Sequence, residues 1–338
     1  CEMDKWGELK ALIAGTTSMV GLPGTSAACF GSLTRSIDVV QNGLADDKIR
    51  TSATFPPSKA TADSDCNAFT QGTADAFLIH CGEGTDQTSL NEFATLGSVS
   101  TTPGCLYAPQ TTITHGVAFT QAEFQTMASK GMKLTWSPAS NVALYGATAD
   151  IPTALDAGVT IALAPDWSMG GSQNILDEMR FANQWDDAHW NNRLDAAALV
   201  KMTTTNAASV LGLPTTLGRI KAGMVADLVV VSGDTTKPYD AIVAATPAAV
   251  RLVMIGGEVL YGDADVGQSL GVSACETFDA CGTPKFLCVA RPGATTDKLD
   301  QTYAQIQAAL EQGLEVADQQ TTSDGFTFAP LTPLVKCP

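Results

Sequence analysis

A histidine and a glutamate three residues apart directly follow a short apolar run, within the stretch from Phe77 to Gly84. The run is typical of a buried strand, so His80 and Glu83 stand at the C-terminal end of that strand, where parallel α/β folds keep reactive groups. An imidazole there can hold a metal ion, while the carboxylate handles protons on a water molecule. A strand that ends in a hydrogen-bonded core histidine gives the same pattern, so other residues must decide between the two.

Two other candidate side chains stand at the ends of other predicted strands. His115 ends a run of β-branched residues, and Asp166 follows a run rich in apolar residues. Because the C-terminal ends of parallel strands meet on one side of a sheet, His80, His115 and Asp166 can converge on one ion. Two imidazoles and a carboxylate suit zinc, and suit iron or manganese less well. The third histidine of the chain, His189, lies in a polar connection and is predicted to be a surface residue.

Short strand-like runs separated by helix-sized connections make up the first half of the chain. They are predicted at residues 16–20, 36–40, 49–55, 76–80, 111–115, 133–137 and 160–164. Regular alternation of strands and helices is typical of a parallel sheet, and this number of units is one short of a (β/α)8 barrel. An open doubly wound sheet is the competing architecture, but no G-x-G-x-x-G follows the first strand. We therefore predict an α/β fold, a TIM-like (β/α)8 barrel that lacks its first strand.

Three parts of the chain are predicted to be separate domains. Helices are expected at residues 4–14, 121–129, 151–157, 174–180, 194–211 and 299–316. The barrel is assigned to residues 1–215, and residues 216–262 have the turns and edge-type strands of a small β unit, a β-sandwich remnant with a hairpin around residues 256–257. Residues 263–338 form a C-terminal tail with cysteines and a loop-like composition.

Charge and composition exclude two classes of partner. The chain of 338 residues carries a formal net charge of −16, with a pI near 4.4, so it has no basic stripe to neutralise the phosphates of a nucleic acid. No apolar run approaches the roughly 20 residues that a membrane-spanning helix needs. We therefore expect neither a nucleic-acid partner nor a membrane span, and we expect a small-molecule substrate, with a homo-oligomer left open.

Cysteine content gives the expectation for the compartment. The chain has nine cysteines, four of them in the last quarter without C-x-x-C spacing: Cys275, Cys281, Cys288 and Cys337. So many cysteines favour disulfides, which also link the tail, and therefore a periplasmic or secreted protein. A set of buried free thiols is the alternative. The odd count leaves at least one cysteine without an intramolecular partner.

The ordered series of motifs resembles the amidohydrolase superfamily. It consists of H-x-x-E at 80–83, T-H-G at 114–116, S-P-A-S-N at 137–141, A-P-D-W-S at 164–168, and a G-R-I-K-A-G run at 218–223. The closest part of the superfamily is the branch of cytosine and guanine deaminases and s-triazine chlorohydrolases. The resemblance covers roughly residues 5 to 262, and the cysteine-bearing tail lies outside it.

The resemblance implies a hydrolase that acts on a C–N bond of a small molecule through a metal-activated water, either an amidohydrolase or a deaminase. His80, His115 and Asp166 correspond to metal ligands of one divalent ion, for which zinc is favoured. Glu83 corresponds to the residue that moves protons between the water and the leaving group, and Asp166 assists it. The S-P-A-S-N element lies at the pocket wall of the family, so Ser137 and Asn141 are candidate substrate contacts, and we add Trp167 beside Asp166.

One departure from the family pattern affects the metal site. The family takes two further metal ligands from an H-x-H on its first strand, and no H-x-H occurs in these 338 residues. Because the helix expected at 4–14 corresponds to the one after that strand, we expect an upstream segment to supply strand 1 and the H-x-H. This chain alone should then bind metal weakly. The alternative is a catalytically incomplete barrel that serves as a binding or structural protein.

Overall fold

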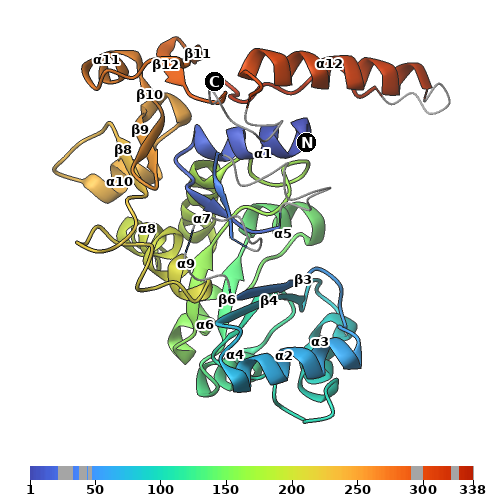
Figure 1. The fold of residues 1–338 in the computed structure, drawn as a ribbon. Helices are drawn as coiled ribbons and strands as arrows, with labels where there is room; N and C mark the ends of the chain where they lie inside the picture. Colours follow the sequence, from blue (N-terminus) through green and yellow to red (C-terminus); the bar gives the residue numbers. More distant parts are fainter. Residues whose placement is uncertain (22–32, 38–43, 45–47, 291–299, 321–326, 338) are drawn as a thin grey trace. The chain divides into compact units, whose positions relative to one another are not determined.

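The computed structural model describes every residue except 22–32, 38–43, 45–47, 291–299, 321–326 and 338 (Figure 1). The described residues form two compact units. Unit 2 comprises Asp46–Val225 and Thr235–Ala244, and unit 1 comprises Cys1–Ala45, Ala226–Asp234 and Ala245–Pro338. The domain boundaries predicted at 215 and 262 stay predictions.

Unit 2 is built on a five-stranded parallel sheet with the strand order β3-β4-β5-β6-β7. The strands are β3 (Ile49–Ser52), β4 (Ala76–Cys81), β5 (Thr111–His115), β6 (Lys133–Trp136) and β7 (Thr160–Leu163). Each strand pairs with the one that follows it in the sequence, which is the order of a (β/α) barrel, whereas a doubly wound sheet reverses its order at a switch point. The predicted mixed α/β fold with a parallel sheet is confirmed.

Helices connect these strands and begin and end at residues suited to capping. They are α2 (Lys59–Gln71), α3 (Gln87–Ser98), α4 (Gln121–Ser129), α5 (Pro138–Tyr145) and α6 (Ile151–Ala157). The helices α2, α3, α4 and α6 start after a side chain that accepts a backbone N–H of the first turn, from Ser58, Asp86, Thr120 and Asp150. Glycines in the left-handed conformation end α2, α5 and α6. Residues next to the helix ends thus determine where most of these connecting helices begin or end.

The helices after the sheet are α7 (Ile175–His189), α8 (Ala196–Thr203), α9 (Thr205–Val210) and α10 (Pro238–Val243). The single helix predicted for 194–211 was wrong, because the chain breaks at Thr204, whose φ of −124° and ψ of −91° are not helical. Three consecutive threonines occupy 203–205, and β-branched residues have reduced helix propensity. Two short helices therefore replace one long one.

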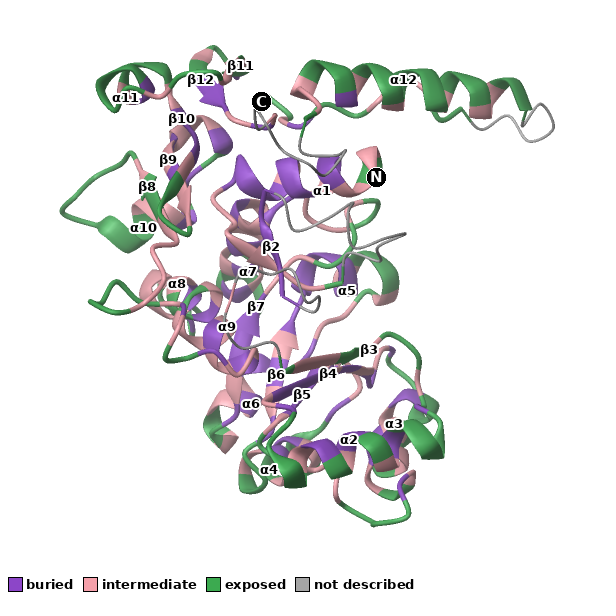
Figure 2. Cartoon of the chain, in the orientation of Figure 1, coloured by how far each residue is buried: buried purple, intermediate pink, exposed green. Residues whose placement is uncertain are grey.

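The core of unit 2 lies on both faces of the parallel sheet. On one face, buried apolar side chains come from successive strands: Phe77, Ile79, Ile113, Leu134 and Ile161. On the other face, Ala76, Thr112 and Ala162 are buried. In Figure 2 the strand β7 is drawn mostly in the colour of buried residues, in agreement with its accessibility. Strands buried on both faces place only their C-terminal ends and the following loops within reach of solvent, which is where the candidate residues stand.

Unit 1 contains a five-stranded antiparallel sheet in the order β11-β12-β10-β9-β8. Its strands are β8 (Leu228–Val231), β9 (Val250–Ile255), β10 (Glu258–Asp263), β11 (Glu276–Ala280) and β12 (Thr283–Leu287). The hairpin predicted at 256–257 is confirmed, and both glycines have positive φ, 63° and 86°. The strands β11 and β12 come from the predicted tail, and they were missed because charged residues interrupt any regular alternation there.

The remaining elements of unit 1 include α1 (Glu2–Leu12), α11 (Ala264–Ser269), the 3-10 turn Pro247–Ala249, α12 (Tyr303–Gln320) and the two short parallel strands β1 (Ser18–Met19) and β2 (Arg35–Ser36). The strand predicted for 36–40 falls partly outside the described residues. Arg35 is paired with Asp227 at 2.9 Å, and Asp227 also accepts the backbone N–H of Gly256 at 2.7 Å.

In the part of the chain that the structure describes, no helix is both long and apolar enough to cross a membrane.

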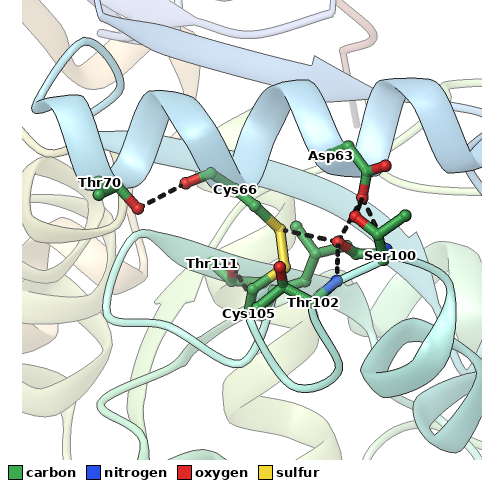
Figure 3. Close-up of a disulfide and its surroundings, with 9 residues drawn as sticks. Asp63, Cys66, Thr70, Ser100, Thr102, Cys105 and Thr111 are labelled. Carbon is green, nitrogen blue, oxygen red and sulfur yellow. Dashed lines mark hydrogen bonds between the residues drawn. A yellow bond between two sulfur atoms is a disulfide. The ribbon is translucent and has the colours of Figure 1, made fainter.

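Three cysteine pairs lie at disulfide distance: Cys66–Cys105, Cys275–Cys288 and Cys281–Cys337. Figure 3 shows the first of them, which joins α2 to the connection between α3 and β5. Beside it, Ser100 donates a hydrogen bond to Asp63 at 2.6 Å. Among the described residues, Cys81 is the free cysteine; it is buried in β4, and burial raises the pKa of its thiol, in agreement with a packing role.

Removing the Cys66–Cys105 pair should destabilise unit 2 measurably. The bond closes a loop with a sequence separation of 39, and the chain-entropy argument gives about 4 kcal/mol for a loop of that size. The double variant C66A/C105A should lose that amount of unfolding free energy in urea titrations. The matched variant C275A/C288A, with a separation of 13, should lose about 3 kcal/mol. Equal stability of C66A/C105A and the unchanged protein would show that the bond does not form.

Candidate active site

The first candidate histidine lies at the end of β4 with one ring nitrogen already engaged. His80 Nδ1 is 3.3 Å from the backbone oxygen of Ser52, at the end of the neighbouring strand β3. A carbonyl only accepts hydrogen bonds, so Nδ1 carries the hydrogen, and the neutral ring keeps a lone pair on Nε2. This is the tautomer that a metal-binding histidine needs, since a second partner on the far nitrogen orients the ring.

The turn after His80 fixes the backbone on both sides of Glu83. Gly82 has a φ of 70°, and a Cβ there would lie 2.4 Å from a ring carbon of Phe119, so only glycine fits. The backbone N–H of Gly82 donates to Glu92 Oε2 at 2.7 Å. Glu92 belongs to α3, so the helix that follows the turn also holds it. Gly84 has a φ of 150°, and a Cβ there would lie 2.2 Å from Ser89 Oγ, so the backbone requires glycine on both sides of Glu83.

The second candidate histidine occupies a strained backbone position at the end of β5. His115 has a φ of 83°, which residues other than glycine rarely adopt, and its side chain is 1% exposed. It stands opposite Cys81 in the register of β4 and β5. The His80 and His115 rings lie 5.0 Å apart between centroids. Strain of this kind is concentrated at functional sites, so the observation favours a functional role over a packing one.

His115 and Glu83 face each other across the ends of the two strands. His115 Nε2 is 3.4 Å from Glu83 Oε2, but this nitrogen is buried and makes no aligned hydrogen bond. Burial lowers the pKa of His115, and the charge of His80 acts in the same direction, while Glu83 and Asp166 oppose the shift. A neutral imidazole beside a carboxylate is an arrangement suited to moving or directing a proton.

Asn141, predicted as a substrate contact, is completely buried and contacts His115. Its amide nitrogen lies 3.1 Å from His115 Nδ1, and its amide oxygen accepts from Thr148 Oγ1 at 3.4 Å. Thr148 in turn accepts from the indole N–H of Trp136 at 2.8 Å. In this amide orientation Nδ1 of His115 accepts and its hydrogen stays on Nε2, while the opposite orientation would free Nε2 for a metal. Asn141 therefore controls which nitrogen of His115 is available.

We expect N141A to lower the unfolding free energy by about 1–3 kcal/mol, because it leaves the buried Nδ1 of His115 without a partner. Urea unfolding measures the change. N183A is the matched control, since Asn183 bonds only to Asp187 at the helix surface, and it should change stability by less than about 0.5 kcal/mol. Equal losses in the two variants would contradict the role given to Asn141.

The remaining predicted residues lie close by but in different environments. Asp166 and Trp167 are exposed in the loop after β7, with Trp167 at 39% exposure. Ser137 is 2% exposed, and its backbone oxygen accepts from Asn141 N and Ser140 Oγ, so it starts α5. His189 is exposed, as predicted, but it is the last residue of α7, so its prediction as part of a connection was wrong.

The described residues fit part of a metal site. His80 keeps a lone pair on Nε2, and the buried Nε2 of His115, which has no hydrogen-bond partner, offers one when the Asn141 amide presents its oxygen to Nδ1, so both are donors of the type that zinc prefers. Within the described ranges, however, no three side chains of His, Cys, Asp or Glu are grouped closely enough to hold a metal ion. Asp166 stands near the two imidazoles without completing such a group.

A buried glutamate that the sequence did not reveal supports the same region. Glu178 of α7 is fully buried, and its Oε1 accepts the backbone N–H of Ala139 in the first turn of α5 at 3.0 Å. Its Oε2 has no hydrogen-bond partner. Burial raises the pKa of Glu178 to about 7.

The raised pKa of Glu178 makes stability depend on pH. The folded state holds this proton up to about pH 7, whereas the unfolded chain releases it near 4.5, so stability is full below 4.5 and falls as pH rises to 7. The loss is on the order of 3 kcal/mol. In E178Q this loss should be absent, so the stability difference between variant and parent should change with pH in urea titrations at pH 4.5 and 8. The control E315Q, on an exposed residue, should show a constant difference.

A tyrosine at the end of α5 was also missed. The hydroxyl of Tyr145 donates to Glu83 Oε1 at 2.9 Å. Tyr145 follows Asn141 by four residues on the same helix, and this spacing was the signal that could have linked it to the site.

The comparison with protein families identifies the family of this chain. The model of the amidohydrolase family matches residues 75–260, more than half of the chain, and this range contains every candidate residue above. The chain belongs to the amidohydrolase family. The resemblance read from the motif series is thereby confirmed.

Two relatives carry the name of the same enzyme. A 5-methylthioadenosine/S-adenosylhomocysteine deaminase of Natronomonas pharaonis is 32% identical over 245 residues, which are 67% of this chain and 55% of the relative. A deaminase of the same name from Haloarcula marismortui is 29% identical over 76% of this chain and 63% of its own length. The chain therefore spans less than two thirds of these relatives.

Solved amidohydrolase structures share the fold. An adenosine deaminase of Xanthomonas campestris with bound zinc superposes with a TM-score of 0.62 at 19% identity, covering 76% of this chain and 69% of that one. An atrazine chlorohydrolase of Arthrobacter aurescens TC1, complexed with zinc, gives 0.53 at 20% identity over 62% and 49% of the two chains. Identities this low establish the fold alone.

Proposed function

We propose that this chain is the catalytic part of an aminohydrolase, which replaces the amino group on a ring carbon of a small molecule by oxygen and releases ammonia. The observation that carries the proposal is the Glu83 carboxylate 3.4 Å from the buried imidazole of His115, at the ends of two neighbouring strands. Family membership and the deaminase names of two relatives support hydrolysis of a C–N bond. Because those relatives act on adenine derivatives by name, an aminopurine nucleoside is the substrate class we favour.

Glu83 is assigned the proton transfers. It accepts a proton from water as the water oxygen bonds to the ring carbon, with Asp166 sharing this proton. It then donates the proton to the departing nitrogen, so the C–N bond breaks and ammonia leaves. The second proton of the water, left on the new hydroxyl, moves to the adjacent ring nitrogen, so the carbon keeps the oxygen as a carbonyl. A carboxylate that acts first as base and then as acid restores its own charge in each cycle.

His80, His115 and Asp166 are assigned to one divalent metal ion, with zinc favoured over iron or manganese. The metal would supply Lewis acidity, which lowers the pKa of a water toward neutrality. The tautomer of His80, set by Ser52, suits this role, and His115 suits it when the Asn141 amide presents its oxygen to Nδ1. We assign the two ligands of the missing H-x-H, with strand 1 of a complete barrel, to polypeptide upstream of these 338 residues.

Trp167 is the predicted substrate contact that we carry forward, because its ring is partly exposed beside Asp166. Ser137 and Asn141 are buried, and we assign them to holding α5 and His115. The β-sandwich remnant is assigned to the antiparallel sheet of unit 1. An exported location is supported by the three cysteine pairs at disulfide distance.

Ammonia release tests the proposal. The complete polypeptide, as its host makes it, is supplied with zinc and incubated with 5′-methylthioadenosine, S-adenosylhomocysteine, adenosine and guanine. We expect one ammonia per substrate consumed for at least one of them. Retained metal without turnover of any C–N substrate would favour the alternative, a binding or structural barrel.

A further inference from the structure

The carboxylate of Glu83 is held from two sides. Its Oε1 accepts the hydroxyl hydrogen of Tyr145 at 2.9 Å, and its Oε2 lies 3.4 Å from His115 Nε2. A phenol beside a carboxylate can only donate, so the Tyr145 contact is a charge-assisted hydrogen bond. With Oε1 occupied in this way, Oε2 is the oxygen that faces the imidazole.

Both groups of the site are held by one short helix. Asn141 contacts His115 and Tyr145 contacts Glu83, and these two residues are four apart on α5, so they project from the same face. The start of α5 is fixed by the hydrogen bond from Ala139 N to Glu178, and the helix ends at the left-handed Gly146. The helix therefore ties the end of β4 to the end of β5 through side chains.

Tyr145 remains a donor throughout the neutral pH range. Burial raises the pKa of Tyr145 to about 12, and its hydrogen bond to Glu83 and the charge of Glu83 add to the shift. A phenol that stays protonated cannot itself take the proton of a reacting water. Its effect on the reaction must therefore pass through the carboxylate.

An ordinary structural tyrosine in the same unit provides a contrast. The Tyr107 hydroxyl donates to the backbone oxygen of Phe93 at 2.5 Å, and its ring stacks on that of Phe93 with centroids 4.7 Å apart. Both of these contacts of Tyr107 are made to the same residue, Phe93. Tyr145 instead contacts the carboxylate to which we assign the proton transfers.

We propose that Tyr145 is a positioning residue, whose hydroxyl holds Oε1 of Glu83 so that Oε2 is directed at the reacting water and at His115. The proposal rests on the role assigned to Glu83 above. Loss of a hydrogen-bond partner that orients a metal ligand costs about 10- to 100-fold in metal affinity or activity, and we expect a similar loss for the partner that orients Glu83. Because Tyr145 is not assigned to the substrate, Y145F should lower kcat by that factor and leave KM within about twofold.

The first test needs no catalytic activity. The chain has three histidines, so ¹⁵N,¹³C-histidine labelling of the metal-free 338-residue protein gives few ring signals. In Y145F the ring signals of His115 should shift, because Glu83 is released from its fixed orientation, while those of His189 should stay. The matched variant Y107F, which also loses one tyrosine hydroxyl, should leave both unchanged. Unshifted His115 signals in Y145F would overturn the proposal.

The second test uses the complete polypeptide and compares kcat and KM for Y145F and Y107F. A fall in kcat confined to Y145F supports positioning, and unchanged kcat in Y145F overturns it even when the His115 signals shift. If the parent protein turns over no C–N substrate, the proposed function fails. The His115 signals then report only whether Tyr145 holds Glu83, so the two failures are distinguishable.

Discussion

E83Q should abolish turnover and leave metal binding unchanged. The amide of glutamine keeps the size of the side chain and can still accept from Tyr145, but it cannot take a proton from water and return it to the leaving nitrogen. Loss of a positioned acid–base group costs about 10²- to 10⁴-fold in rate. The rate of ammonia release, measured at saturating substrate, should fall by at least 10²-fold.

The control for this change is E123Q. Glu123 is a half-buried member of the capping box at the start of α4, and glutamine serves equally well in that motif. We expect wild-type rates from E123Q. Full activity in E83Q would contradict the role of Glu83, and metal loss in E83Q would instead make Glu83 a ligand.

H80A should remove most of the bound zinc. His80 is the residue whose ring has a hydrogen-bonded Nδ1 and an available Nε2, so its removal takes away a ligand that the protein has already oriented. Loss of an outer-sphere partner lowers metal affinity about 10- to 100-fold, and loss of a ligand should exceed that. Zinc content after dialysis of the complete polypeptide, measured by mass spectrometry, gives the affinity change.

H189A provides the matched control for H80A. His189 is exposed and stacks on Trp185 with ring centroids 3.7 Å apart, and it is not among the residues assigned to the metal. We expect H189A to retain as much zinc as the parent protein. Equal zinc content in H80A and H189A would place the metal ligands elsewhere.

The sheet and the position of the site could be predicted because the signals for them are local. The buried strands β4 and β5 read as continuous apolar or β-branched runs, and a histidine at the end of each was conspicuous in a chain with only three. Parallel strands bring such ends together whatever the connections contain. The proximity of His80, Glu83 and His115 followed from those few facts.

What could not be predicted depends on side-chain direction and on pairing between distant segments. The burial of Asn141 against His115 and the contact of Tyr145 with Glu83 depend on how α5 is rotated, which a helix of eight residues does not reveal. The spacing of apolar residues in α7 is equally compatible with an exposed Glu178, so its burial could not be predicted. The strand β12 is held by pairing with β10, and β11 by pairing with β12, and neither has an alternating pattern of its own.

The central claim is that Glu83 moves the protons in a metal-assisted hydrolysis of a C–N bond. The most direct test measures ammonia release and bound metal on the same samples of the complete polypeptide, unchanged and as E83Q. We expect equal metal content in both, with ammonia release lower in E83Q by at least about 10²-fold. Equal rates of ammonia release from the two proteins, at equal metal content, would contradict it.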